Sequence, residues 1–191
     1  MKRKDTVQAL LDRESIRDCI YRCCRGIDRV DEAALRSAYW PDAVCRHASH
    51  EGSGAEFVDW VLPRLRAGGR SSHLIGNILI ELHGPSAAVE SYFRTIVGAR
   101  EDDGTPVETL MAGRYVDRFE RRAGEWRIAQ RTVVYDWIRH ARLDRDMDDD
   151  AFGARLPTGT RHPHDPLYAL LADPSFTRGP AAHSQETTCP C

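Results

Sequence analysis

The sequence predicts an α+β fold in which helices cover a curved sheet of antiparallel strands. The main observation is the stretch from Leu110 to Arg139, where two long runs of β-forming residues meet at a turn marked by Gly124. Two further strand candidates precede this hairpin, and apolar residues recur at helical spacing through the N-terminal third of the chain. A chain of 191 residues is long enough for one domain plus an appendage. We therefore expect one domain at 1–142 and an extension at 143–191.

The N-terminal region is expected to hold three helices. The first covers residues 6–27 and ends near Gly26, and the second runs from Glu32 to Trp40, where Pro41 stops it. The third begins at Ser53 or Gly54 and is closed by the glycine pair 68–69.

The strands follow the helices in the chain, apart from a short candidate at 43–46. Period-two patterns predict strands at 71–82 and 87–100, joined by a turn, and then the long hairpin. On its outgoing strand this period places five residues on one face: Ala129, Arg131, Val133, Tyr135 and Trp137. Neither face is purely polar, so we expect helices to cover one face and a partner subunit to cover the other. Arg131 is either a snorkelling side chain or a fixed cation in an apolar cavity.

Composition excludes several classes of protein. The formal net charge of -2 and the 29% of charged residues give no basic surface for DNA or RNA. The N-terminus lacks the apolar core of a secretory signal, and no stretch approaches the length of a membrane span. We expect a cytoplasmic protein with reduced cysteines, no metal site and no cofactor, since neither G-x-G-x-x-G nor a P-loop occurs.

The composition changes from Leu143 onward. An acidic run is followed by six of the ten prolines, and such a segment cannot build a core of its own. Residues 167–171 are expected to form one helical turn that docks on the domain or on a neighbour, with disorder after Arg178.

Two residues are candidates for chemistry beside Arg131. Asp28 follows the first helix directly, and His73 lies on an otherwise apolar strand, so both are placed to face inward. A carboxylate beside a histidine fixes the tautomer and stabilises the imidazolium, which makes a general base. On residues alone, Asp28 also fits a turn and His73 also fits a core histidine bonded to backbone.

Several motifs resemble the SnoaL-like branch of the nuclear-transport-factor-two-like superfamily. They are the run from Arg13 to Asp31, S-H-L-I-G-N at 72–77, G-R-Y-V-D-R-F-E at 113–120 and W-R-I-A-Q-R-T at 126–132. The resemblance covers about residues 8–140. It implies a cone of curved antiparallel sheet with helices closing an apolar pocket, assembled as a homodimer or homotrimer. Similar members include hexachlorocyclohexane dehydrochlorinase, scytalone dehydratase, bile acid dehydratase and formaldehyde lyases.

The resemblance implies a catalytic set of Asp28, His73 and Arg131. In the dehydrochlorinase of this branch, an Asp and His pair abstracts a proton, and an Arg and a Lys stand near the leaving group. The Lys or Tyr that lies five residues before this Asp is Cys23 here, and a neutral thiol is a poorer proton donor to a leaving group. Six residues are expected to line the pocket and bind substrate: Cys23, Tyr39, Trp60, Tyr92, Tyr115 and Tyr135.

The expected function is that of a cofactor-independent lyase. It would eliminate water from a hydrophobic cyclic or aromatic alcohol, or release formaldehyde by a retro-aldol step, with His73 as base. An isomerase or epoxide hydrolase is an alternative, although it usually requires a second carboxylate, for which Asp117 and Asp136 are the candidates. A non-catalytic binding or assembly module is a third, and it would not require the pairing of Asp28 with His73.

Overall fold

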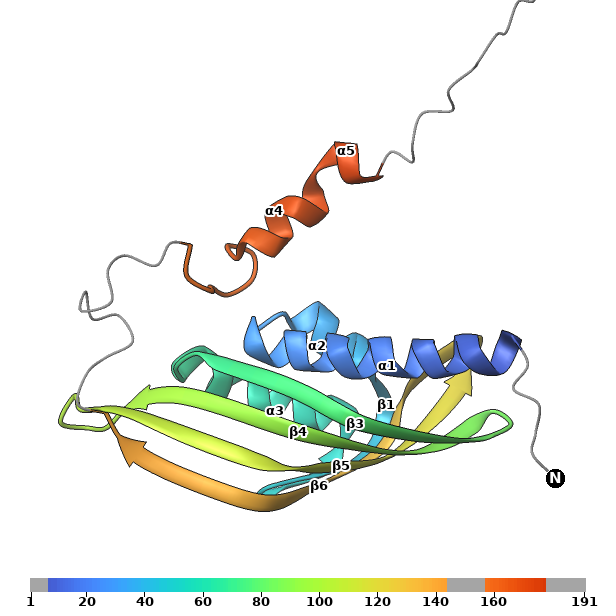
Figure 1. Cartoon of the computed structure of the whole chain (residues 1–191), viewed down its shortest axis with the longest axis horizontal. Helices are drawn as coiled ribbons and strands as arrows, with labels where there is room; N and C mark the ends of the chain where they lie inside the picture. Colours follow the sequence, from blue (N-terminus) through green and yellow to red (C-terminus); the bar gives the residue numbers. More distant parts are fainter. Residues whose placement is uncertain (1–6, 144–156, 178–191) are drawn as a thin grey trace, which may run out of the picture.

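A single curved sheet with helices on its concave side forms the body of the protein (Figure 1). The computed structural model describes residues 7–143 and 157–177. Six strands follow the order β2-β1-β6-β5-β4-β3, and α1 and α2 lie across the concave face. The predicted α+β class with helices over a curved sheet is therefore confirmed.

Three helices form this layer, and the second and third begin at side-chain caps. They are α1 (Val7–Asp28), α2 (Glu32–Ala38) and α3 (Gly54–Ala67). Asp31 accepts a hydrogen bond from the backbone of Ala34 at the start of α2, and Ser53 forms a capping box at the start of α3. The prediction that the second helix reaches Trp40 is wrong, because Tyr39 and Trp40 already belong to the strand that follows.

The strands are longer than the sequence pattern predicted. They are β1 (Tyr39–His47), β2 (His50–Ser53), β3 (Ser71–His83), β4 (Ser86–Arg100), β5 (Pro106–Arg122) and β6 (Glu125–Arg142). Consecutive strands from β3 to β6 pair antiparallel, whereas β1 pairs parallel with β6. The turn between β5 and β6 is Ala123-Gly124, and both residues have positive φ, as a two-residue hairpin turn requires.

The strand pairing shifts register at several points, and two of these bulges change which side chains face inward. In β3 the register shifts between Gly76 and Leu79, where Asn77 has a φ of 48°, a conformation that Asn tolerates. In β6 a second bulge leaves Asp136 without a partner in the ladder, because Ala112 pairs with Trp137 and Gly113 with Tyr135. An added Cβ at Gly113 would lie 2.0 Å from the carbonyl oxygen of Val134. Past this second bulge Trp137 is 75% exposed, so the prediction that it shares a face with Arg131 is wrong.

The core lies between the helical layer and the concave face of the sheet. Helix residues Ile20, Leu35 and Phe57 pack there against Phe119 and Ile128 of the hairpin, and all five are buried. No helix in the described ranges combines the length and the apolar character that crossing a lipid bilayer requires.

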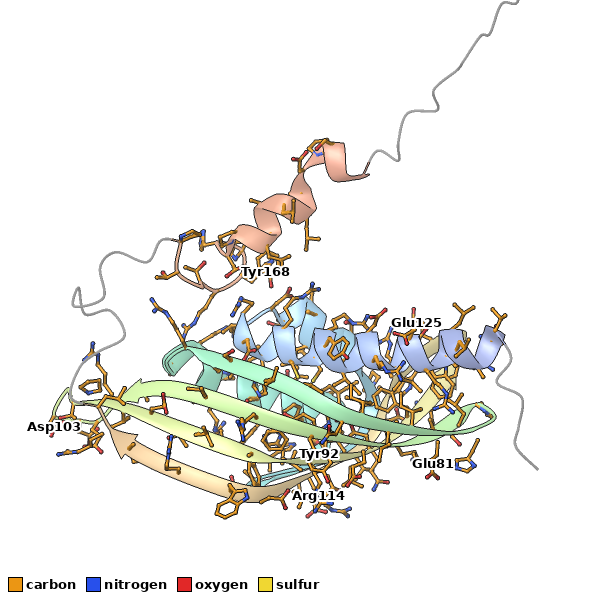
Figure 2. The ribbon with its side chains drawn as sticks, viewed as in Figure 1. Glu81, Tyr92, Asp103, Arg114, Glu125 and Tyr168 are labelled. Carbon is orange, nitrogen blue, oxygen red and sulfur yellow. The ribbon has the colours of Figure 1, made fainter. Side chains whose placement is uncertain are left out.

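Part of the C-terminal extension packs against the domain. It forms α4 (Pro166–Ala172) and α5 (Pro174–Thr177), which confirms the predicted helical turn at 167–171. The hydroxyl of Tyr168, on the side of α4 that faces the helical layer, donates to Asp31 Oδ2 at 2.9 Å (Figure 2). Arg29 Nε lies 3.2 Å from Asp165 Oδ2. The disorder predicted after Arg178 falls outside the described residues.

Candidate active site

Asp28 is the last residue of α1 and links this helix to the start of β3. Its Oδ1 accepts from the hydroxyl of Ser71 at 2.8 Å and lies 2.6 Å from Nδ1 of His73, while its Oδ2 accepts from the backbone N–H of His73 at 2.9 Å. A carboxylate at the C-terminal end of a helix is unfavourable for the helix dipole. These hydrogen bonds compensate for that position.

The environment of Asp28 keeps its side chain ionised at neutral pH. Burial raises the pKa of this carboxyl, but the hydrogen bonds and the positive charge of His73, together with Ser71, outweigh burial and lower the pKa below its ordinary value. Because the carboxylate is ionised, Nδ1 of His73 carries the hydrogen and donates it.

His73 lies on the inner face of β3, opposite Thr95 of β4. Its side chain is 8% exposed and that of Asp28 is 12% exposed. With Nδ1 engaged by Asp28, Nε2 is the free ring nitrogen, and within the described part of the chain it has no hydrogen-bond partner. The pair therefore has the geometry of a general base with its orienting carboxylate.

An open pocket of about 440 Å³ borders the pair. Its wall is formed by one side of α1, by the start of β3 including His73, and by Asp165 and Leu167 of the C-terminal segment. This volume lies in the range of small-molecule sites. Among the residues at 7–143 and 157–177, no group of His, Cys, Asp and Glu is arranged to hold a metal ion.

Arg131 lies deeper, in the core, and is held by a second carboxylate. Its Nε and Nη2 donate to the two oxygens of Asp117 at 2.9 and 2.6 Å, and both side chains are almost fully buried. Burial opposes the charge of Arg131, yet the Asp117 carboxylate raises the pKa of Arg131 well above its ordinary value. Arg131 is thus a permanent cation, but it is already paired and does not border the open pocket.

Three predicted pocket residues surround this cation. Nη1 of Arg131 donates to the hydroxyl of Tyr39 at 3.2 Å and to Cys23 Sγ at 3.5 Å, and the guanidinium lies 4.0 Å from the centre of the Tyr115 ring. Cys23 Sγ lies 3.7 Å from the Tyr39 hydroxyl. The phenol of Tyr39 therefore stands beside Cys23 in the core, away from the wall of the open pocket.

Trp60 and Tyr135 belong to an aromatic group around His47 at the end of β1. The ring of His47 stacks on Phe57 at 5.1 Å and lies 6.5 Å from the rings of both Trp60 and Tyr135. Burial, and to a lesser extent electrostatic repulsion from Arg131, His73 and His50, lower the pKa of His47 to about 4. His47 therefore lies within electrostatic reach of both His73 and Arg131.

None of the six residues predicted to bind substrate is in the wall of the open pocket, as far as the structure describes the chain, and Tyr92 is also turned away from the helices. It is 43% exposed on the outer face of β4, whereas Ser91 and Phe93 point inward. The placement of Tyr92 in the pocket is therefore wrong, because strand alternation turns its side chain away from the helices.

Sequence reasoning missed several polar residues of the interior. Within the described ranges, His47 Nδ1, Ser91 Oγ and Thr95 Oγ1 are buried and lack hydrogen-bond partners. Ser91 and Thr95 have the period of two along β4, and His47 has it with Cys45 along β1, so alternation could have identified all three. Asp117 was considered only as a second catalytic carboxylate, because its pairing with Arg131 depends on the register between β5 and β6.

The sequence matches a known domain family over most of its length. The profile of the SnoaL-like domain family matches residues 8–132, a range that contains Asp28, His73 and Arg131. No curated protein is significantly similar to the chain in sequence.

Solved structures share the fold at low sequence identity. The Kfla4162 protein of Kribbella flavida superposes with a TM-score of 0.62 at 16% identity, over 69% of this chain and 95% of that one. A hexachlorocyclohexane dehydrochlorinase, LinA type 2, gives 0.61 at 20% identity, over 70% and 90% of the two chains. A candidate scytalone dehydratase of Novosphingobium aromaticivorans gives 0.61 at 16% identity, over 68% and 87%.

Proposed function

This chain belongs to the SnoaL-like domain family, and we propose that it acts as a cofactor-independent lyase on a hydrophobic cyclic or aromatic alcohol. The observation that carries this proposal is the 2.6 Å contact between Asp28 Oδ1 and His73 Nδ1 at the wall of a pocket. A non-catalytic binding module has no need of an ionised carboxylate that fixes the tautomer of a histidine.

In the proposed reaction, Nε2 of His73 removes a proton from a carbon next to the one that carries the leaving group. The imidazolium that forms is stabilised by Asp28, whose lowered pKa keeps it anionic while the proton is on the ring. A positioned base of this kind contributes roughly 10²–10⁴-fold to a rate. The C–H bond breaks, a C=C bond forms, and the leaving group departs with its electron pair.

We assign the protonation of the departing hydroxide to Tyr21. Within the described residues it is the phenol that borders the pocket, and it lies on the same side of α1 as Asp28. Tyr39 lies in the core, where burial raises its pKa well above its ordinary value although Arg131 opposes this. Its hydroxyl accepts from Arg131 Nη1, so we assign neither Tyr39 nor Arg131 a contact with the leaving group.

The alternative of an isomerase or epoxide hydrolase is less well supported. It requires a free second carboxylate, and Asp117 is bound through both oxygens to Arg131. Asp136 is exposed and accepts from Arg114, which projects from the convex face of the sheet (Figure 2).

The test is a product analysis on a panel of cyclic and aromatic alcohols with an acidified C–H beside the carbinol carbon. The protein is incubated with each compound in D₂O, and mass spectrometry records loss of water, loss of formaldehyde or uptake of deuterium. The lyase predicts at least one of these changes, and His73→Ala should abolish it. Saturable binding of panel compounds without any of these changes would instead support the binding module.

A further inference from the structure

The pocket beside Asp28 and His73 contains charges of both signs, and most of them neutralise each other. Of the two carboxylates in its wall, Asp28 is bound by His73 and Ser71. Asp165 accepts from the backbones of Thr160 and Leu167 and pairs with Arg29. Both carboxylates and one of the two guanidinium groups are therefore engaged within the protein.

Arg25 is the exception. It lies in the last turn of α1 and borders the pocket, yet within the described ranges its side chain makes no hydrogen bond or ion pair, and its Nε is buried without a partner. A basic residue near the C-terminal end of a helix is favourable for the helix dipole, which accounts for the sign of the charge. The dipole does not account for a buried N–H donor that lacks an acceptor, which is costly.

The position of Arg25 on the helix directs it to the same space as the base. Tyr21, Cys24, Arg25 and Asp28 all border the pocket, and their spacing puts them on one side of α1. A molecule in the pocket therefore meets the planar donor groups of Arg25 about one helical turn from Asp28. A guanidinium at such a site suits carboxylate, sulfate or phosphate groups, which accept two hydrogen bonds from it.

We propose that Arg25 binds an anionic group on the substrate, so that the pocket selects a hydrophobic alcohol that also carries a carboxylate or a similar anion. The apolar part of the substrate contacts Leu74, Ile75 and Leu167 in the wall of the pocket. Arg131 does not perform this recognition, because Asp117 already occupies its paired donors. This inference names the substrate class of the site proposed above and rests on that function only for the alcohol and the reaction.

Binding of a matched pair of probes tests the inference without requiring turnover. The probes are 2-naphthoate and 2-naphthylmethanol, which share a ring system and differ in charge, titrated by their fluorescence against the full-length protein. The wild type should bind the carboxylate about tenfold more tightly than the alcohol, and added salt should weaken only the carboxylate.

Variants on the same helix assign the effect to one side chain. Arg25→Gln should remove the preference for 2-naphthoate and leave 2-naphthylmethanol unchanged, and Arg25→Lys should restore part of the preference. The control is Arg22→Gln, which removes another cation with a buried Nε from outside the pocket wall and should retain the preference. Equal affinity of the wild type for the two probes, or an equal loss of both in Arg25→Gln, would overturn the inference.

The reaction and the recognition can fail separately. His73→Ala should retain the preference for the anion, because binding by Arg25 does not depend on the base. If the protein proves to be a binding module, the charge preference and its loss in Arg25→Gln remain measurable. If the protein is a lyase that does not recognise an anionic group, turnover persists while 2-naphthoate and 2-naphthylmethanol bind with equal affinity.

Discussion

Asp28 contacts His73 twice, once at the backbone N–H with Oδ2 and once at Nδ1 with Oδ1, at 2.9 and 2.6 Å. The first contact fixes where β3 begins relative to the end of α1. The second fixes the direction of the imidazole ring. One carboxylate therefore sets both the position and the tautomer of the proposed base.

Replacement of His73 by alanine should remove the base and leave the fold intact. We expect turnover to fall by roughly a hundredfold or more, because no other described imidazole is paired with Asp28. The matched control is His83→Ala, an exposed histidine at the end of the same strand. Steady-state rates and circular dichroism check this, and full activity in His73→Ala would exclude the proposed mechanism.

The charge of Asp28 should contribute to stability in a pH-dependent way. Although burial opposes ionisation, the bonds from His73 and Ser71 bring the folded-state pKa below the ordinary value of 3.8. The stabilisation is therefore fully present above that value and is lost as the pH falls through the folded-state pKa. Urea unfolding of the wild type and Asp28→Asn between neutral and strongly acid pH should give free energies that converge at the acid end. A difference that is independent of pH would contradict this.

The buried pair of Arg131 and Asp117 should behave as a unit. Arg131→Met alone leaves an uncompensated buried carboxylate, so we expect about 3–5 kcal/mol lower free energy of unfolding. The double variant with Asp117→Leu removes both charges and should recover much of that loss. Chemical denaturation of the wild type, both single variants and the double variant measures the coupling. Additive losses would mean that the two side chains act independently.

Removal of the Tyr21 hydroxyl should slow the departure of poor leaving groups selectively. Tyr21→Phe keeps the ring in the pocket wall but loses the donor, so elimination of water should fall roughly tenfold or more. An analogue with a leaving group that needs no proton, such as a halide, should be affected far less. Rates of the two substrates with wild type and Tyr21→Phe provide the comparison. An equal effect on both substrates would show that Tyr21 is not the proton donor.

Much of the fold could be predicted from sequence, because strand alternation and helix caps are local properties. The hairpin turn at Gly124 and the cap at Ser53 follow from residue types within a few positions. The side chains gathered around Arg131 could be predicted less well. Their arrangement depends on the register between β5 and β6, and the bulge at Asp136 reverses the face on which later residues of β6, such as Trp137, lie. Tyr92 was misplaced because a tyrosine on a strand fits either face.

Of the proposed site, the pair of Asp28 and His73 could be predicted from the sequence, whereas Arg25 could not. The resemblance of the motifs placed Asp28 and His73 together, and the structure has their side chains within hydrogen-bond distance. Without the resemblance, residue patterns did not decide whether Asp28 only formed a turn or whether His73 was only a core histidine. Arg25 gave no signal in the sequence, because its significance lies in the lack of a partner, which only the three-dimensional arrangement reveals.

The hydroxyl of Tyr168 donates to Asp31, the same residue whose side chain caps α2. A fragment trimmed after residue 142, a common choice when a compact domain is wanted for crystals, would lose this anchor together with Asp165 and Leu167. The remaining cavity would be wider and less selective than that of the intact chain. Inhibitor screens and substrate profiling should therefore be done with the extension in place.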